Sequence, residues 1–400
     1  MTQSKLAEFL SLSALALALT GCSGGGGSDS GSDTGTPDTG GTDQSGIRSA
    51  TVDASSQTDY VYFNLARGET VALSAEQAAA SQDWHIAFRR TNVKLNGGAS
   101  GPGSVAGALL APQDDFYDAD GEADPNVFLN ATPDSELEHL SGQLTPAARL
   151  VSDSVSTALE GSGDMVGGQM DMGWYYYNLT THTLSLNDTT GWLLKSGEGD
   201  SYARFHATAF AYSSTDGLDV TFEFDVQPSG AATFETAATF TAKVASGETA
   251  CFDFDDNQAT SCDGSDWDLQ VGLANRSLYL RSNGGVSGAG KGAAFGPFLW
   301  EDLVADYPSG TADKDGNAIS FLYTADSTSG ILTQESWYAY AVTGQAGDHK
   351  LYPNYRVYQV AVNPADPAAP QYAVQILSYY HLGTGASGHY SFRWRELDAQ

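Results

Sequence analysis

Three methionines and a histidine surround a short aromatic run in the first half of the chain. Met165, Met170 and Met172 fall within eight residues, just ahead of Gly173-Trp174-Tyr175-Tyr176-Tyr177, and His182 follows. A thioether can bind Cu(I) or act as an axial ligand of haem iron, and an imidazole can do the same for iron. Methionines also fill gaps in ordinary cores, and a lone loop histidine is often simply solvated. The spacing therefore indicates a candidate metal-ligand segment, with a structural alternative beside it.

The remaining histidines are weaker candidates. His139 lies upstream of the methionines and could supply a second donor. His85 and His206 fall in strand-like runs, where we expect structural histidines with satisfied hydrogen bonds. The second half has only His349 in the corresponding region. A ligand site is therefore expected in the first half.

Two acidic loops have the beginning of a calcium-binding pattern. Residues 118–124 and 313–317 each start D-x-D-G, in which alternate oxygens and a glycine turn can wrap a hard cation. Neither loop ends in the bidentate glutamate that such loops carry at their twelfth position. These loops predict either a weak calcium site or exposed acidic turns.

Composition and motifs narrow the class of function. The net charge of −31, from 18 basic and 49 acidic residues, argues against nucleic acid or an anionic membrane surface as a direct ligand. The sequence has no G-x-S-x-G, no H-E-x-x-H and no P-loop. We expect a binding protein and no enzyme.

The N-terminus predicts a lipoprotein. An apolar run over residues 10–19 is too short to span a bilayer and ends in Leu19-Thr20-Gly21-Cys22, which resembles a bacterial lipobox. The prediction is a signal peptide over residues 1–21, lipid on Cys22, and a Gly/Ser/Asp tether over residues 22–47. Ser23 favours the outer membrane, at the cell surface or on its periplasmic face.

Two cysteines remain after the lipidated one. Cys251 and Cys262 are eleven positions apart. In an oxidising compartment, an even number of remaining cysteines favours a disulfide between them. A two-cysteine metal site is the weaker alternative, because neither residue belongs to a C-x-x-C pair.

The elements that must position these residues are strands. Short runs rich in β-branched and aromatic residues, bounded by Gly, Asn, Asp or Pro, recur throughout, and several alternate apolar and polar. Residues 74–81 and 135–140 are the candidate helical turns. The pattern predicts an all-β protein of mostly antiparallel sheets with long loops.

Four landmarks occur twice in the same order. Asn96-Gly97-Gly98 returns as Asn283-Gly284-Gly285, each after an Asp-Trp pair, and Trp174 is echoed by Trp337 in a second aromatic run. Later Tyr-Ala pairs and closing strands complete the repeat. We expect two tandem copies, with domains at residues 48–240 and 245–400.

The ordered set of landmarks resembles the HmuY family of haem-binding lipoproteins, once over residues 50–235 and again from Asp266 onward. The resemblance implies an all-β fold that binds haem or a porphyrin at the cell surface for iron acquisition. It also implies transfer of the haem to an outer-membrane receptor, such as a TonB-dependent one. The family's downstream axial histidine corresponds to Leu179 and Val342, so other donors must serve here.

The resulting hypothesis places haem in the first domain. His182 would bind the iron, with Met170, Met172 or His139 opposite. Tyr175, with Trp174 and Tyr177, would form apolar walls. Arg204 or Arg149 would neutralise the propionates. The alternative is an adhesion or other non-haem binding lipoprotein on the same fold, with a glycan or protein partner.

Overall fold

The computed structural model of the chain describes residues 46–274 and 276–398, and it is mostly β, as the sequence predicts. The strands are built from alternating side chains. In β15 (Thr236–Val244), for example, every second residue from Ala238 onward is buried, as expected for an antiparallel strand with one covered face. Both predicted helical segments contain a helix. Ser74 caps α2 (Ala75–Ala80) in a capping box with Gln77, and α4 covers Leu137–Ser141.

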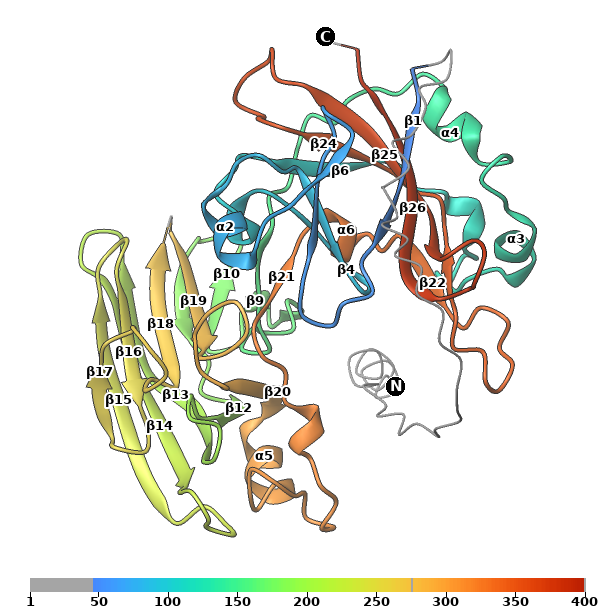
Figure 1. Cartoon of the computed structure of the whole chain (residues 1–400). Helices are drawn as coiled ribbons and strands as arrows, with labels where there is room; N and C mark the ends of the chain where they lie inside the picture. Colours follow the sequence, from blue (N-terminus) through green and yellow to red (C-terminus); the bar gives the residue numbers. More distant parts are fainter. Residues whose placement is uncertain (1–45, 275, 399–400) are drawn as a thin grey trace. The chain divides into compact units, whose positions relative to one another are not determined.

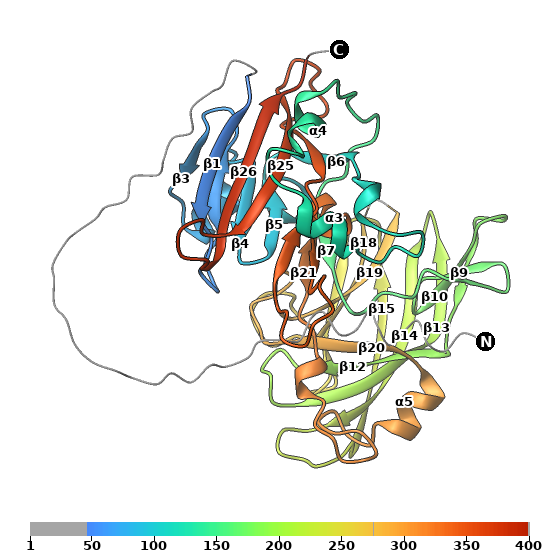
Figure 2. The same cartoon turned by 90° about the vertical axis from the view of Figure 1, so that its right-hand side faces the viewer.

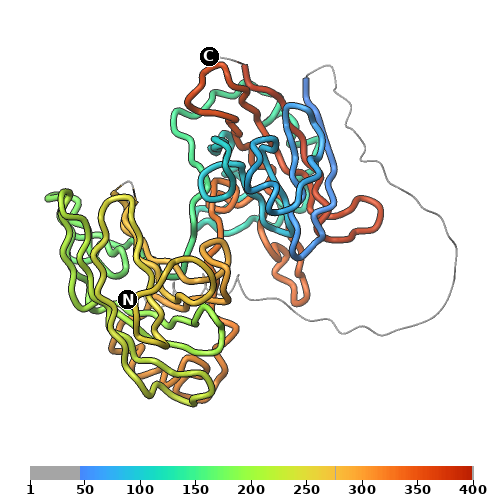
Figure 3. The backbone as a smooth tube through the Cα atoms, turned by 60° about the vertical axis from the view of Figure 1, so that its left-hand side comes forward, coloured from blue at the N-terminus to red at the C-terminus, as the bar shows by residue number. Residues whose placement is uncertain are grey.

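The described residues form two compact units. One unit is a continuous segment, and the other is built from two segments that flank it in the sequence. Unit one consists of residues 155–327, and unit two of residues 46–154 together with residues 328–398. The chain passes between them within β7 (Ser154–Ser156) and β21 (Ser327–Ser329). In Figure 3, the blue and red ends of the chain belong to one unit and the green and yellow middle to the other.

Unit two is built around two antiparallel sheets. Its five-stranded sheet has the order β1-β26-β25-β24-β6, so that N-terminal and C-terminal strands lie side by side (Figure 2). Its four-stranded sheet has the order β3-β2-β4-β5, and β22 pairs with β23. The strands are β1 (Arg48–Asp53), β2 (Val61–Asn64), β3 (Glu69–Val71), β4 (Ile86–Arg89), β5 (Asn92–Leu95), β6 (Ala106–Ala111), β22 (Tyr338–Tyr340), β23 (Leu351–Pro353), β24 (Val357–Ala361), β25 (Gln371–Tyr380) and β26 (Ser387–Glu396). The further helices are η1 (Gly98–Ser100), η2 (Asp114–Phe116), α3 (Pro125–Asn130) and α6 (Ile331–Gln334).

Unit one repeats this plan. Its five-stranded sheet has the order β15-β14-β13-β12-β20, and its four-stranded sheet has the order β17-β16-β18-β19 (Figure 1). A second four-stranded sheet, β11-β10-β9-β8, carries the methionine segment. The strands are β8 (Met165–Val166), β9 (Gln169–Asp171), β10 (Tyr175–Asn178), β11 (Leu184–Leu186), β12 (Thr190–Lys195), β13 (Tyr202–Ser213), β14 (Gly217–Gln227), β15, β16 (Thr249–Asp253), β17 (Gln258–Thr260), β18 (Leu269–Ala274), β19 (Ser277–Ser282) and β20 (Ala293–Leu299). The helices are α5 (Trp300–Asp306) and η3 (Ser320–Leu322).

The predicted division at residues 240–245 does not describe these units. That boundary falls inside unit one, where it begins within β15 (Thr236–Val244) and ends before β16. The reason lies in strand pairing. β6 pairs with β24 and β1 with β26, whereas β12 pairs with β20 and β14 with β15. Each unit therefore combines the first part of one repeat with the last part of the other.

The two Asn-Gly-Gly blocks form the same turn. Asn96 Nδ2 donates to the Trp84 carbonyl at 2.8 Å, and Asn283 Nδ2 donates to the Trp267 carbonyl at 2.7 Å. Gly98 has φ +59° and Gly285 has φ +62°, and a Cβ on either would collide with a backbone carbonyl, of Asp153 or Asp326 respectively. Only glycine satisfies both restrictions, which explains why this block is so recognisable in the sequence.

Candidate functional site

The predicted ligand segment folds into the small sheet β11-β10-β9-β8 of unit one. Tyr177 on β10 is paired with Leu184 on β11 and with Met170 on β9, and Met170 is paired with Met165 on β8. Directly paired residues of an antiparallel sheet point to the same side. These four side chains therefore form one row, which we call the methionine face.

The methionine face connects the core of unit one with solvent. Tyr175, two positions before Tyr177, points to the same side and is buried in the main core cluster, and Leu184 packs against that cluster. At the outer end of the row, Met165 is 54% exposed. An apolar row that emerges from a core into solvent offers contact area for a flat apolar ligand.

His182 lies in the turn between β10 and β11, beside Tyr177. Its Nδ1 is 2.7 Å from the Tyr177 phenol oxygen, and its backbone N–H donates to the Asn178 carbonyl at 2.8 Å. His182 has φ +56°, a conformation that costs a non-glycine residue about 1 kcal/mol. The turn therefore holds an exposed imidazole against the phenol that belongs to the methionine face.

The other residues of the hypothesis have mainly structural surroundings. Tyr175 stacks on Phe210 with 5.7 Å between ring centroids, and burial, with the charge of Glu160, raises its pKa to about 12. Trp174 is buried beside it, and Met172 packs against the same core. The aromatic side chain nearest the surface is the half-buried Tyr177, because Tyr175 and Trp174 are core residues.

Two further candidates lie elsewhere. His139 is on α4 of unit two, where its Nε2 lies 3.3 Å from the Glu136 carboxylate. Arg204 on β13 donates from Nε to Asp225 at 2.7 Å, and its guanidinium lies 4.8 Å from the Phe234 ring centroid. The structure thus places His182 and Met170 each beside Tyr177, and it does not bring His139 into the same unit.

The positions that correspond to the family's axial histidine differ in exposure. Leu179 is 47% exposed in the turn that leads to His182. Val342 is buried in unit two, in a cluster with Phe116, Phe128 and Tyr355. Neither side chain has a metal-binding atom, and the Val342 side chain packs in a hydrophobic cluster.

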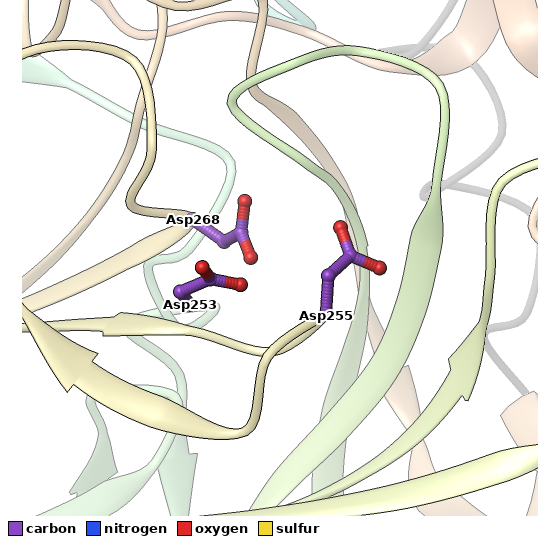
Figure 4. Close-up of side chains that lie close together, drawn as sticks. All are labelled: Asp253, Asp255 and Asp268. Atoms are coloured by element: carbon purple, nitrogen blue, oxygen red, sulfur yellow. The ribbon is translucent and has the colours of Figure 1, made fainter.

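Three carboxylates that the sequence analysis did not single out converge in unit one (Figure 4). Asp253, Asp255 and Asp268 each have an oxygen within 4.8 Å of the others. Asp268 is fully buried and accepts backbone N–H groups of Gly197 and Phe254, both at 2.8 Å. Burial raises the pKa of Asp268 to about 8, against the opposing effect of these hydrogen bonds. Burial likewise raises the pKa values of Asp253 and Asp255.

The equivalent position in unit two indicates a structural role for Asp268. There His85 accepts the Leu65 N–H through Nδ1 at 3.2 Å, as Asp268 accepts that of Phe254. Burial lowers the pKa of His85 to about 4, so the imidazole is neutral and can accept this bond at pH 7. Both side chains accept a backbone N–H group directly after the end of a strand, from Leu65 and from Phe254 respectively.

The two D-x-D-G loops use their carboxylates on their own backbone. Asp118 Oδ1 accepts the N–H groups of Asp120 and Glu122, and Asp313 Oδ1 accepts those of Asp315 and Asn317. In the residues that the structure describes, the carboxylates close enough to share a cation are those of Figure 4, outside both loops. Calcium in these loops therefore has no support.

The predicted Cys251–Cys262 disulfide is present, with Cα atoms 5.3 Å apart. Cys22, the signal peptide and the tether lie outside the described residues. Within the described part, no helix is both long and apolar enough to span a membrane.

One protein-family model matches part of the chain. The sequence model of the HmuY protein family matches residues 56–224. Over these residues the chain is similar to the HmuY family, and the matched segment contributes to both units. No curated protein matches the sequence.

Three solved structures resemble the chain at low identity. A Bacteroides vulgatus protein named as a HmuY-like heme binding protein has a TM-score of 0.31 and 10% identity, and covers 88% of this chain and 92% of its own. A Bacteroides fragilis protein named as a lipoprotein has a TM-score of 0.28 and 11% identity. The match covers 88% of this chain and 91% of that protein. The apo HmuY analog of Tannerella forsythia has a TM-score of 0.16 and 18% identity. The match covers 46% of this chain and 96% of that protein. The TM-scores are low, so the similarity to the HmuY family rests on the sequence match over residues 56–224.

Proposed function

We propose that this protein binds haem or a related porphyrin on the methionine face of unit one. The observation that carries the proposal is the meeting of an imidazole, a phenol and two thioethers where an apolar row leaves the core. Imidazole, phenolate and thioether are all protein ligands that haem iron accepts, as is the cysteine thiolate, and apolar side chains provide contact for the macrocycle. The residues present therefore fit such a ligand.

The arrangement favours a single axial donor from this sheet. Met170 is the direct cross-strand neighbour of Tyr177, and both point to the same side. Two donors on opposite sides of an iron atom must come from segments that face one another. Met170 and Met165 consequently serve as apolar contacts in this proposal, while the Tyr177–His182 pair faces the iron. This replaces the hypothesis of a methionine opposite His182.

The proposal includes the location and partner that the resemblance implies. A lipid on Cys22 would anchor the protein in the outer membrane, and the haem would pass to an outer-membrane receptor. An exposed site suits such transfer because the receptor can reach the ligand. Membrane fractions of cells that produce Cys22→Ser should lose the protein, since the substitution removes the lipid attachment site.

Titration of hemin into the soluble chain that begins after Cys22 tests the function. We expect a shifted Soret band with saturable binding. His182→Ala should shift that band and weaken binding more than tenfold, whereas His206→Ala, at a histidine that stacks on Trp300 in the same unit, should leave both unchanged. Equal spectra for His182→Ala and the wild type would dismiss this site.

One surface feature favours the alternative of a glycan partner. His206, Glu223, Asp225, Thr239 and Trp300 line a small cleft on the five-stranded sheet of unit one. Aromatic rings beside carboxylates can stack on sugar rings and accept their hydroxyl groups. If hemin produces no spectral change, titration with oligosaccharides, with Trp300→Ala as the negative control, tests this second function.

A further inference from the structure

Both units contain a tyrosine–histidine pair of the same geometry, each with an exposed imidazole. In unit one, Tyr177 Oη lies 2.7 Å from His182 Nδ1, with 6.1 Å between ring centroids and 37° between ring planes. In unit two, Tyr340 Oη lies 2.6 Å from His349 Nδ1, with 6.2 Å and 30°. In each pair, one nitrogen of the imidazole faces the phenol oxygen.

The two pairs occupy equivalent places in the fold. Tyr177 is the third residue after Trp174, and Tyr340 is the third after Trp337. Tyr177 is paired with Leu184, and Tyr340 with Leu351; in each case the histidine stands two residues before that leucine. Both tyrosines thus lie at the outer end of a hairpin whose inner end is anchored by a buried tryptophan.

The loops that supply the histidines differ. Five positions separate Tyr177 from His182, and nine separate Tyr340 from His349. Backbone hydrogen bonds already close both turns, from Asn178 to Thr183 and from Ala341 to Lys350. A side-chain hydrogen bond adds only about 1 kcal/mol. Turn closure therefore does not explain why two different loops deliver an imidazole to the same phenol oxygen.

We propose that Tyr177 and Tyr340 are the iron ligands of two ferric porphyrin sites, one in each unit, and that His182 and His349 assist them. This inference rests on the proposed function and extends it to unit two. The protein's methionines are Met1 and the three of unit one, so thioethers cannot be the shared ligand. The donor pair that both units share is phenol and imidazole. Phenolate is an established haem-iron ligand, and its hard oxygen favours Fe(III).

The chemistry of ligation uses both partners of each pair. As the Tyr177 oxygen bonds to ferric iron, its O–H bond breaks and the proton passes to His182 Nδ1. The water or chloride that occupied the iron of free hemin leaves to solvent. The imidazolium then donates a hydrogen bond to the coordinated oxygen, which keeps the ring in place. Tyr340 and His349 would act in the same way, beside the half-buried Tyr338 and Leu351.

The test combines stoichiometry with a spectroscopic signature of the ligand. Hemin is titrated into the full soluble chain and into Tyr177→Phe, Tyr340→Phe and the double variant. We expect two, one, one and no hemin bound with phenolate ligation. Resonance Raman bands of a coordinated phenolate should shift when the protein contains ring-deuterated tyrosine. Tyr176→Phe, on the opposite side of β10, is the matched control and should retain two sites.

The outcomes separate this inference from the proposed function. If hemin binds but the double variant keeps the wild-type spectrum and stoichiometry, the tyrosine assignment is overturned while haem binding stands. If His182→Gln removes ligation and Tyr177→Phe retains it, the imidazole is the ligand and the assignment is again wrong. If the wild type binds no hemin, the proposed function fails. Circular dichroism on each variant verifies the fold.

Discussion

His85 and Asp268 occupy equivalent buried positions, and we expect them to give the two units opposite dependences on pH. His85→Gln and Asp268→Asn replace each titrating group by a side chain that can still accept a hydrogen bond. Both groups accept a backbone N–H, from Leu65 and from Phe254. The variants therefore remove the titration while they keep an acceptor in place.

The signs follow from the direction of each pKa shift. His85 has a folded-state pKa of about 4 against an ordinary 6.5, so its contribution to stability is present above pH 6.5 and is lost as the pH falls toward 4. Asp268 has a folded-state pKa of about 8 against 3.8, so its contribution is complete below pH 3.8 and is lost as the pH rises toward 8. Acid should weaken unit two through His85 and strengthen unit one through Asp268.

The magnitudes follow from about 1.4 kcal/mol per pKa unit. Between pH 7 and pH 5, the shift of His85 corresponds to a loss of about 2 kcal/mol from the free energy of unfolding of unit two. Over the same interval, the shift of Asp268 corresponds to a gain of about 2–3 kcal/mol in unit one. His85→Gln and Asp268→Asn should each abolish the respective change.

Hydrogen exchange with mass spectrometry measures each unit separately, on peptides that contain the Leu65 or the Phe254 amide. After correction for intrinsic rates, protection of Leu65 should fall at pH 5 in the wild type and not in His85→Gln. His206→Gln, in unit one, is the control and should keep the wild-type response of Leu65. An acid-induced loss in His85→Gln as large as in the wild type would refute the reasoning.

Three further predictions concern the architecture. The fragment 155–327 is continuous and contains the sheets of unit one, so it should fold alone with a cooperative thermal transition. A fragment that ends at residue 240 lacks β16–β20 and should show no such transition for unit one. Gly98→Ala combines φ +59° with a Cβ placed 2.0 Å from the Asp153 carbonyl oxygen, and it should destabilise unit two by more than about 2 kcal/mol in urea unfolding. Gly121→Ala, where a Cβ meets open space, is the control and should cost less. Asp153→Ala removes the buried acceptor of the Leu95 N–H and the Ser100 hydroxyl, and it should cost about 2–4 kcal/mol, while a loss below 0.5 kcal/mol would contradict the role of this carboxylate.

Local sequence patterns were sufficient for the elements and for the repeated turn. Alternation in β15, the Ser74 cap and the Asn-Gly-Gly blocks are all set by neighbours within a few residues. The assembly of the units was wrongly predicted, because repeats of similar sequence present interchangeable pairing partners. β6 can meet a strand of either repeat, and residue patterns do not say which one it pairs with.

The candidate site could be predicted only in part. The spacing around Trp174 marked a segment in which both His182 and Met170 neighbour Tyr177, and the role of these residues as ligands stays a prediction. It could not show that Tyr175 points into the core while Tyr177 meets the histidine, since both lie on the same side of one strand and differ only in distance from the core. The Figure 4 carboxylates were missed because they come from two strand ends that pairing brings together.

Hemin titration of the soluble full-length chain, followed by the Soret band, tests the central claim most directly. We expect saturable binding with a shifted Soret band in the wild type, and binding at the site of unit one weakened more than tenfold in His182→Ala. A wild-type protein whose addition leaves the hemin spectrum unchanged would contradict the proposal that this protein binds haem.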